Sequence, residues 1–320
     1  MRLATIRTAA GSVHTVADLS VIAADLMLDV ARLDRDIPAD LKAILEGGLL
    51  GRVAHLVELE IGRFRSGEVT VEQAIADGRC YRGDTVEWLP PVLNPGKMIM
   101  VGSNYNAHLK ENEKVPGGQP EKAGEKPHEP HAFPKVPQTM VGHRQPMRLA
   151  PYSTQFDYET ELCLVIGKAC KAVDPADYRS VLAGYTILND ASSRNLQYEE
   201  RVQGMFVFGK NLDATAPCGP WMTTDDTIGD PENLRLRCWV NGAIRQDETT
   251  ANMIFTLGEL VAHCSRDITL QPGDLIATGC PAGCGIFFDP PEAGLLHDGD
   301  LVEMEIDGIG RLSNRVVASF

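Results

Sequence analysis

The sequence is poor in cysteine, in aromatic residues and in basic charge. Its 320 residues include eight cysteines, 6% aromatic residues, and 30 Lys and Arg against 44 Asp and Glu. Eight scattered cysteines are too few for a disulfide scaffold, so they favour a reducing compartment. The formal net charge of −14 argues against a nucleic-acid or membrane-surface partner, because phosphate groups and anionic lipids would be repelled.

Long apolar runs are also missing. The run Leu275–Phe288 has no charged residue or histidine, but it contains Pro281 and glycines and is shorter than the about 20 residues that span a bilayer. No clean apolar segment of the secretory type precedes Asp18. We therefore expect a cytoplasmic protein without a transmembrane helix.

The length and composition predict a folded protein of about two domains. Hydrophobic residues make up 43% and charged residues 23% of the chain, which is close to the average for soluble globular proteins. The segment Trp88–Lys97 reads WLPPVLNPGK, and its three prolines cannot lie inside a helix. We place a domain boundary there, with a small N-terminal α/β domain over residues 1–94 and a second domain over residues 95–320.

The two parts differ in their apolar patterns. In the first, Val16–Leu33 and Leu49–Gly62 have apolar residues at helical spacing. The second consists of short apolar runs between glycine and proline turns, among them the strand-like MFVFGKN over residues 205–211. This pattern predicts an α+β fold, a mixed β-sandwich or roll with few helices. The helices that we expect there are Ala176–Ala183, Ser192–Val202 and Thr256–Cys264.

The stretch Glu111–Pro137 differs from both parts. It has six prolines, three glycines, four lysines and two histidines, His128 and His131, without apolar periodicity. We predict a long loop, which is either a solvated insertion or a lid beside the functional site.

Paired carboxylates provide the strongest local signal. Glu159 and Glu161 precede the apolar run LCLVIG, and alternate residues of a strand share one face. A divalent cation would keep both ionised in a partly buried cavity, and oxygen ligands suit Mg²⁺, Mn²⁺ or Ca²⁺. Asp190, at the end of another apolar strand, is a third candidate. These residues alone leave open that both glutamates are solvated on an edge strand.

A histidine and a glutamate form a second candidate pair. His108 and Glu111 are three positions apart in a predicted helical turn, so the carboxylate could orient the imidazole and raise its basicity. Such a dyad can serve as a general base. A surface contact between the two side chains is the alternative.

Two further motifs lack parts that their chemistry requires. Gly204–Asn211 has the glycine and lysine spacing of a phosphate-binding loop, but Asn211 replaces the required Ser or Thr. Cys280 and Cys284 could begin a zinc site, yet no second Cys or His pair follows at ligand spacing. We therefore predict two core or loop thiols, and a metal coordinated only by oxygen.

Residues 96–317 closely resemble the fumarylacetoacetate hydrolase superfamily. The resemblance is carried by seven segments in order: VGSNYNAHLKE, DYETELCLVIGK, GYTILNDASSRNLQ, FGKNLDATAPCGPW, WVNGAIRQDETTANMIF, LQPGDLIATGCPAGCG and GDLVEMEIDGIGRLSN.

The resemblance implies a roll that binds Mg²⁺ or Mn²⁺, acts on 2-oxo acids and is usually dimeric. It places functional residues at nine positions: metal ligands at Glu159, Glu161 and Asp190, proton transfer or activation of water at His108 and Glu111, a lysine beside metal and substrate at Lys210, and substrate contacts at Arg194, Gln197 and Thr278.

The resemblance predicts a homodimeric hydrolase that cleaves a carbon–carbon bond in a 2,4-diketo acid, through a metal-bound enolate, in aromatic catabolism. The expected substrate is of the acylpyruvate or fumarylpyruvate type. The same scaffold also supports oxaloacetate decarboxylation and isomerisation or hydration of 2-oxo-enedioates. A non-catalytic metabolite-binding protein is the alternative of another class. Cys280, where the family usually has threonine, and the turn at residues 142–144 depart from the pattern near the expected substrate rim, which leaves the substrate open.

Overall fold

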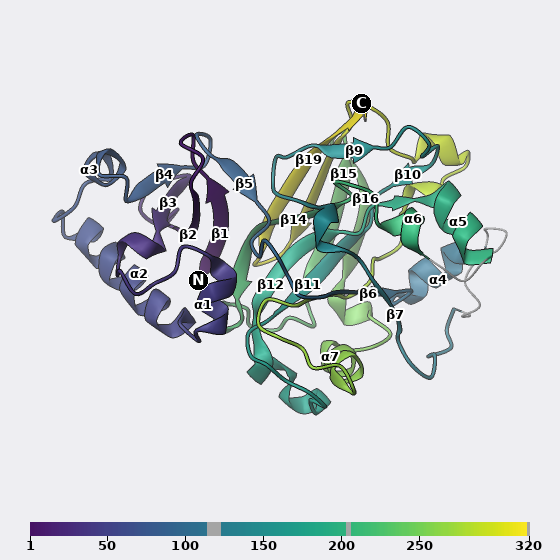
Figure 1. The fold of residues 1–320 in the computed structure, drawn as a ribbon. Coiled ribbons are helices and arrows are strands. Elements are labelled where there is room, and N and C mark those ends of the chain that lie inside the picture. The colour runs from purple at the N-terminus through teal and green to yellow at the C-terminus, as the bar shows by residue number, and fades with distance from the viewer. Residues whose placement is uncertain (114–122, 203–205, 319–320) are drawn as a thin grey trace.

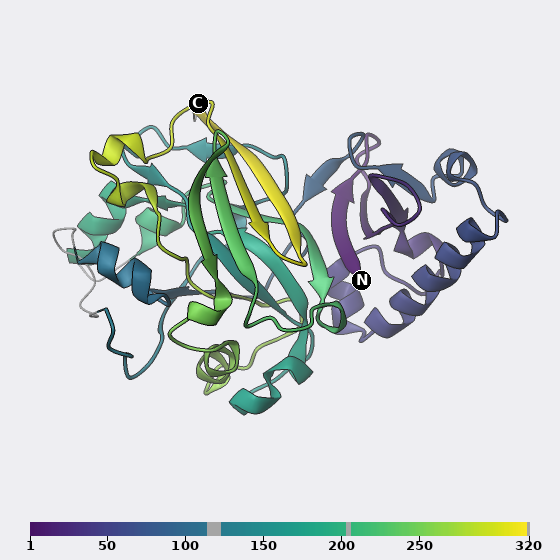
Figure 2. The same cartoon turned by 180° about the vertical axis from the view of Figure 1, so that it is seen from behind.

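The computed structural model describes residues 1–113, 123–202 and 206–318 (Figures 1 and 2). One large mixed sheet runs through the whole molecule, and a second sheet packs on one face of its C-terminal half. The large sheet has the order β4-β3-β2-β1-β14-β12-β11-β17-β6-β7, with β5 beside β1 and β8 beside β14. The α+β prediction with a sandwich-like catalytic part is confirmed.

The strands of the large sheet are β1 (Arg2–Arg7), β2 (Val13–Asp18), β3 (Leu26–Asp29), β4 (Cys80–Arg82), β5 (Glu87–Leu89), β6 (Met98–Gly102), β7 (His131–Pro134), β8 (Met140–Val141), β11 (Thr160–Ile166), β12 (Leu182–Asn189), β14 (Ala216–Thr224) and β17 (Leu275–Ala277). The second sheet contains β16 (Ala243–Thr249), β15 (Arg235–Val240), β18 (Leu301–Ile306), β19 (Gly310–Ala318) and β9 (Met147–Leu149). A short pair is formed by β10 (Phe156–Asp157) and β13 (Ser192–Ser193).

The described α-helices are α1 (Leu41–Glu46), α2 (Leu50–Arg65), α3 (Val71–Ala76), α4 (Asn106–Asn112), α5 (Arg194–Val202), α6 (Val207–Lys210) and α7 (Leu257–Ser265). The expected helix over Leu49–Gly62 is confirmed as α2, and those over Ser192–Val202 and Thr256–Cys264 correspond to α5 and α7. The expected helix over Ala176–Ala183 is a 3₁₀ helix, Pro175–Val181, which leads directly into β12.

Strand β11 lies at the centre of the large sheet, and every residue in it is buried. Leu162 and Leu164 pack against side chains of the second sheet, whereas Cys163 and Val165 point into the core on the other face. Because both faces are covered, the strand is a continuous apolar run after Glu161 rather than an alternating one.

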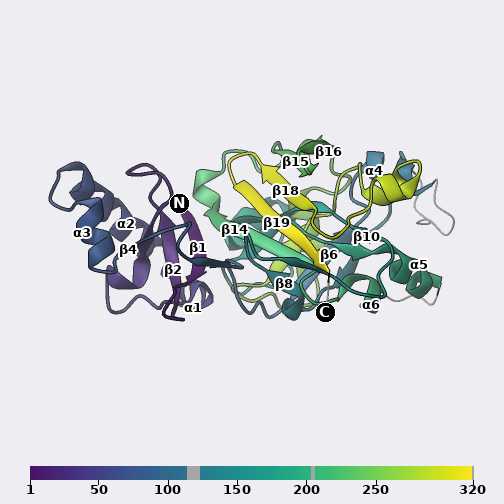
Figure 3. The same ribbon diagram turned by 90° about the horizontal axis from the view of Figure 1, so that it is seen from above.

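The N-terminal elements lie at one end of the molecule (Figure 3). They join the large sheet directly, since β1 pairs with β14 through Arg2 opposite Thr223 and Leu3 opposite Met222. One apolar core includes side chains of α1, α2, β1 and β11. The division at residue 94 therefore stays a prediction.

The helix expected over Val16–Leu33 is wrong. The end of strand β2 and the whole of β3 fall in this segment and pair as a hairpin, with Ala17 opposite Leu28. Leu19 and Leu26 are buried on either side of the turn, while Val21 between them is 65% exposed. The apolar spacing that suggests a helix thus comes from two short strands and the turn that joins them.

The strand expected at residues 205–211 is also wrong in its described part. Residues Val207–Lys210 form the helical turn α6. Gly209 lies so close to α5 that a Cβ there would approach the Cα of Gln197 to 2.5 Å. Packing of α6 on α5 therefore overrides the β-propensity of the aromatic and branched residues.

The stretch Glu111–Pro137 is not a continuous loop. Helix α4 extends to Asn112, and β7 pairs with β6 at the edge of the large sheet. An edge position accommodates Pro134, because its missing N–H faces away from the ladder. The predicted lid falls partly on residues 114–122, which lie outside the described residues.

In the described ranges, no helix is both long and apolar enough to span a bilayer, as expected from the sequence. The cytoplasmic location and the homodimer stay predictions.

His143 connects the N-terminal elements to the second sheet. Its ring packs edge-on against the ring of Trp88, with the ring centroids 5.3 Å apart. Its Nδ1 accepts a hydrogen bond from the N–H of Ser313 at 3.1 Å. Burial, together with the charge of Arg144, lowers the pKa of His143 from 6.5 to about 4. The folded protein therefore keeps this imidazole neutral under conditions in which the unfolded chain protonates it.

We expect the free energy of unfolding to fall as the pH drops from about 6.5 to about 4, because the unfolded chain then binds a proton that the fold rejects. His143→Gln removes this contribution. We measure the free energy of unfolding in urea at pH 7 and at pH 4.5. Between these two pH values the wild type should lose about 1–3 kcal/mol more of this free energy than the variant. Equal losses in both proteins would contradict the assignment.

Candidate active site

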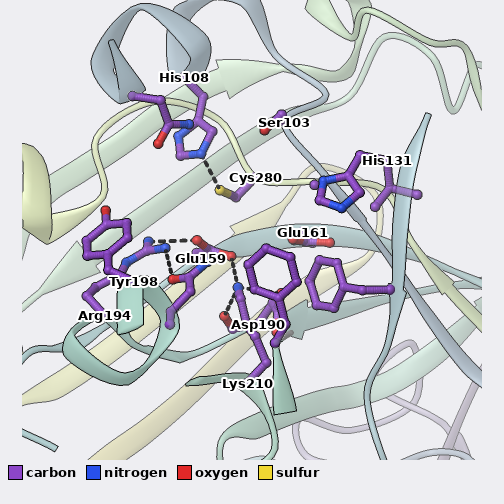
Figure 4. A pocket seen from close by; sticks show the side chains of 16 residues that line it. Ser103, His108, His131, Glu159, Glu161, Asp190, Arg194, Tyr198, Lys210 and Cys280 are labelled. Carbon is purple, nitrogen blue, oxygen red and sulfur yellow. Dashed lines mark hydrogen bonds and ion pairs between the residues drawn. The ribbon is translucent and has the colours of Figure 1, made fainter. Parts of the chain in front are cut away.

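Three carboxylates meet where strand β11 of the large sheet begins and its neighbour β12 ends (Figure 4). Glu161 lies in β11, Glu159 just precedes it, and Asp190 follows β12. The two strands are antiparallel, and the N–H of Asp190 donates to the carbonyl of Glu159 at 3.0 Å. The pairing brings all three side chains to one pocket, where each of the three residues is buried.

Three buried cations face two of these carboxylates. The Nζ of Lys210 is 2.7 Å from Glu159 Oε2 and 2.7 Å from Asp190 Oδ2. The Nζ of Lys135 lies 2.8 Å from Asp190 Oδ1, and Arg194 Nη2 lies 2.6 Å from Glu159 Oε1. Burial opposes the charge on Glu159, but Lys210 and Arg194 outweigh it and hold its pKa below the ordinary value.

Glu161 has no such cation among the described residues. Its Oε2 accepts a hydrogen bond from the N–H of Gly279 at 2.9 Å. Burial, followed by the charges of Asp190 and Glu159, raises the pKa of Glu161 well above its usual range. A proton or a further cation is needed to neutralise this carboxylate.

The buried charges do not balance. With Asp157, which Arg194 also contacts, there are four buried carboxylates against three buried Lys and Arg side chains, so 4 − 3 leaves one negative charge among the carboxylate, Lys and Arg groups. The members of this set are Asp157, Glu159, Glu161 and Asp190 on one side, and Lys135, Arg194 and Lys210 on the other. Oxygen donors with an excess negative charge match the requirements of a hard divalent ion, so the residues present fit a bound Mg²⁺ or Mn²⁺.

Helix α4 places His108 and Glu111 above the carboxylates (Figure 4 shows His108). His108 Nδ1 is 3.8 Å from Glu111 Oε2, so the predicted pair is present at ion-pair distance. Both oxygens of Glu111 accept the N–H of Gly283, at 3.0 and 3.1 Å. Glu111 thereby connects α4 to the turn that follows β17.

That turn brings two thiols to His108. Cys280 Sγ is 3.9 Å from His108 Nε2, and Cys284 Sγ is 4.0 Å from Nδ1. Burial opposes the imidazolium, but the hydrogen bond and the charge of Cys284 outweigh it and raise the pKa of His108 to about 10. Sequence spacing offers no partner for these cysteines, because His108 lies 172 positions before Cys280.

The turn depends on glycine. Gly283 has φ +101°, and a Cβ there would lie 2.0 Å from the carbonyl oxygen of Arg245. Gly279 has φ +92° and supplies the N–H that Glu161 accepts. Cys280 directly follows Gly279 and Cys284 directly follows Gly283, so both thiols project from a backbone path that these two glycines permit.

Helix α5 carries the predicted substrate residues Arg194 and Gln197, and both line the pocket. The guanidinium is already engaged: Nε donates to Asp157 Oδ2 at 2.8 Å and Nη1 donates to Gln197 Oε1 at 3.0 Å. Arg194 therefore orients Glu159 and Gln197. Asp157 was missed as a functional residue, although it begins the DYETE segment.

Thr278 lies beneath the pocket and is not among its described lining residues. Its hydroxyl donates to the carbonyl of Leu162 at 3.0 Å, and its own carbonyl accepts from Asn104 at 2.9 Å. The predicted contact of Thr278 with a substrate carboxylate has no support in this arrangement, because the hydroxyl has only one proton to donate.

Three residues at or behind the pocket were missed from the sequence. Lys135 is fully enclosed, and its Nζ also donates to the carbonyls of Ala191 and Thr215 at 3.1 and 2.9 Å. Ser103 and His131 line the pocket, and their Oγ and Nδ1 atoms are buried without a hydrogen-bond partner among the described residues. No sequence signal marks these positions. Ser103 is placed by a backbone angle, φ +58°, that the sequence does not reveal, and Lys135 and His131 lie in a stretch without apolar periodicity.

Comparison with known proteins identifies the class. Residues 97–317 match the family model described as fumarylacetoacetate (FAA) hydrolase C-terminal, so the chain belongs to the fumarylacetoacetate hydrolase family. Oxaloacetate tautomerase fahd2, mitochondrial, of Xenopus laevis is 39% identical over 233 residues, which cover 72% of this chain and 69% of that protein. Oxaloacetate tautomerase YisK of Bacillus subtilis (strain 168) is 38% identical over 238 residues, covering 74% and 75%.

Solved structures agree with this assignment. Fumarylacetoacetate hydrolase from Exiguobacterium antarcticum has a TM-score of 0.76 and 30% identity, with full coverage of both chains. Maleylpyruvate hydrolase from Sphingobium sp. SYK-6, in complex with manganese(II) and pyruvate, has a TM-score of 0.71 and 27% identity, also with full coverage. The family includes tautomerases, hydrolases and isomerases, so family membership does not establish hydrolase activity here.

If Glu161 is a metal ligand, Mg²⁺ should change the melting temperature of the protein. Saturating Mg²⁺ should raise the melting temperature of the wild type by roughly 3 °C or more, because only the folded chain assembles the ligands. Glu161→Gln should remove this increase and should not lower the melting temperature of the metal-free protein, since it also removes like-charge repulsion. Both are measured by differential scanning fluorimetry. Glu292→Gln, the same substitution at an exposed residue, serves as the control. An equal Mg²⁺ shift in both variants would exclude Glu161 as a ligand.

Proposed function

We propose that this protein is a metal-dependent enzyme that moves a proton at C3 of a short 2-oxo dicarboxylic acid, with oxaloacetate as the substrate and keto–enol tautomerisation as the reaction. The observation that carries the proposal is the position of His108, a buried imidazole facing three carboxylates across one pocket. Similarity to oxaloacetate tautomerases over 72–74% of the chain supports oxaloacetate over a diketo acid.

Glu159, Glu161 and Asp190 are the residues that would hold the metal. Bound there, Mg²⁺ or Mn²⁺ would polarise the 2-oxo group and stabilise negative charge on its oxygen. Lys210 lies between Glu159 and Asp190, so it orients both carboxylates and adds positive charge beside the reacting carbonyl. Arg194 has the same orienting effect on the other oxygen of Glu159.

His108 is the group that moves the proton in this proposal. Its neutral form accepts a proton from C3, and its charged form returns one, so both forms take part in a tautomerisation. The thiol of Cys284 lies 4.0 Å from Nδ1 and stabilises the charged imidazole from that side of the ring. Glu111, 3.8 Å from the same nitrogen, stabilises the charged imidazole.

Hydrolysis of a carbon–carbon bond is the second candidate. It is favoured by the likeness to maleylpyruvate hydrolase, whose structure holds manganese(II) and pyruvate. In that reaction His108 and Glu111 would activate a water instead of removing the C3 proton.

A substrate panel separates the candidates. The Mg²⁺-loaded protein is incubated with enol-oxaloacetate, oxaloacetate, acylpyruvates, fumarylpyruvate and 2-oxo-enedioates, and the products are identified by NMR. We expect accelerated enol–keto conversion of oxaloacetate without loss of carbon. Pyruvate with a second acid from a diketo substrate would establish the hydrolase instead, and turnover of none would favour a metabolite-binding protein.

His108→Ala should lower kcat for the tautomerisation by about 100-fold or more, which is typical for loss of a general acid–base group. The affinity for Mg²⁺ should stay nearly unchanged, because the imidazole is not part of the oxygen ligand set. Stopped-flow absorbance of the enol measures the first quantity, and the Mg²⁺ melting shift measures the second. Full activity of the variant would remove His108 from the mechanism.

His131 offers a contact for the distal carboxylate of the substrate. It lies in β7 on the pocket wall beside Phe133 and Phe206, and its Nδ1 has no partner among the described residues. We expect His131→Phe to raise KM for oxaloacetate by about 10-fold or more while kcat changes little, because a binding contact common to ground and transition states is lost. A fall in kcat at constant KM would contradict this binding role.

A further inference from the structure

A second group of metal-binding side chains lies next to the carboxylates. It consists of His108, Cys280 and Cys284, all buried, and one donor atom from each lies within 4.8 Å of the others. The three donors are an imidazole and two thiols, whereas the carboxylate set offers oxygen. The two groups therefore differ in the ions they prefer, because sulfur and imidazole ligands select softer metals such as Zn²⁺.

The spacing of the sulfur atoms matches a tetrahedral ion. Two thiolates about 2.3 Å from one Zn²⁺ at the tetrahedral angle lie roughly 3.8 Å apart. Cys280 Sγ and Cys284 Sγ are 3.7 Å apart. Cys280 Sγ is 3.9 Å from His108 Nε2, a few tenths of an ångström beyond the roughly 3.5 Å of such a site, whereas the 4.0 Å contact of Cys284 Sγ is to the other ring nitrogen, Nδ1. One donor atom from each residue lies within 4.8 Å of the others, so the imidazole has to rotate to bring one nitrogen to bonding distance of an ion held by both sulfurs.

The surroundings hold these donors in place. Gly283 lies between the cysteines with φ +101°, and there is no space for a Cβ at this position. The backbone of the turn therefore packs directly against its neighbours. Glu111 accepts the N–H of Gly283 and lies 3.8 Å from His108 Nδ1. A carboxylate beside the second ring nitrogen is the usual partner of a metal-bound histidine, and it leaves Nε2 to face the ion.

We propose that His108, Cys280 and Cys284 form a binding site for Zn²⁺ or a similarly soft divalent ion, separate from the Mg²⁺ or Mn²⁺ site of the carboxylates. Three protein donors leave the fourth tetrahedral position to water, as in open zinc sites. The ion binds two thiolates and a neutral imidazole, so the protons that these three groups carry before binding are released to solvent and no electron is transferred.

Occupation of this site inhibits the enzyme. The ion takes the lone pair of the His108 nitrogen that would otherwise accept the substrate proton, and it lies at the pocket wall, which Cys280 lines. This consequence rests on the proposed function, whereas the binding site itself does not.

The site is tested with Co²⁺ as a spectroscopic substitute for Zn²⁺. Full-length protein is reduced, saturated with Mg²⁺ to occupy the carboxylates, and titrated with Co²⁺ while the near-ultraviolet thiolate-to-Co(II) absorption is recorded. We expect this band to saturate at one Co²⁺ per chain and to disappear on addition of equimolar Zn²⁺. The readout needs no turnover, so it remains informative if the proposed reaction is wrong.

Cys280→Ser and Cys284→Ser should each abolish at least half of the band intensity, and His108→Ala should weaken Co²⁺ binding about 10-fold or more. Cys264→Ser, a buried thiol on α7, is the matched control and should leave the band unchanged. Full intensity in Cys284→Ser would overturn the proposal, because the ion would then be held by Cys280 with Glu159 and Glu161. A wild-type protein without the band would overturn it as well.

Discussion

The burial of four carboxylates against three cations is the constraint on which the pocket depends. Lys135, Lys210 and Arg194 pair with Glu159, Asp190 and Asp157 at distances of 2.6–2.8 Å, so these groups form a buried network. Such a network is stable only while every member is paired, since removing one partner leaves an uncompensated buried charge. Glu161 is the member without a cation among the described residues, and a divalent ion at this position would complete the set.

The fold builds this arrangement from few elements. The antiparallel pairing of β11 with β12 brings Asp190 beside Glu159, and β17, on the other side of β11, ends in the turn that binds Glu161 through Gly279. The second sheet excludes water from the opposite face of β11. The base and the thiols arrive from α4 and from this turn, so one rigid strand positions the acidic side chains and its neighbours position the groups above them.

Sequence reasoning recovers what depends on local spacing. The period of two places Glu159 and Glu161 on one face, the period of about four pairs His108 with Glu111, and the seven family segments indicate the fold. It fails where a contact joins distant segments: Lys135 reaches Asp190 across 55 positions and Cys280 reaches His108 across 172. It also fails in Val16–Leu33, where two short strands and a turn imitate helical spacing.

Counting bound Mn²⁺ tests the central claim most directly. Free Mn²⁺ is measured by electron paramagnetic resonance in equilibrium with the reduced protein, with Glu161→Gln and the Cys280→Ser, Cys284→Ser double variant in parallel. The account predicts one tightly bound Mn²⁺ per chain in the wild type and in the double variant, and its loss in Glu161→Gln. Unchanged binding in Glu161→Gln, or loss of Mn²⁺ in the double variant alone, would contradict the claim that the buried carboxylates hold the ion.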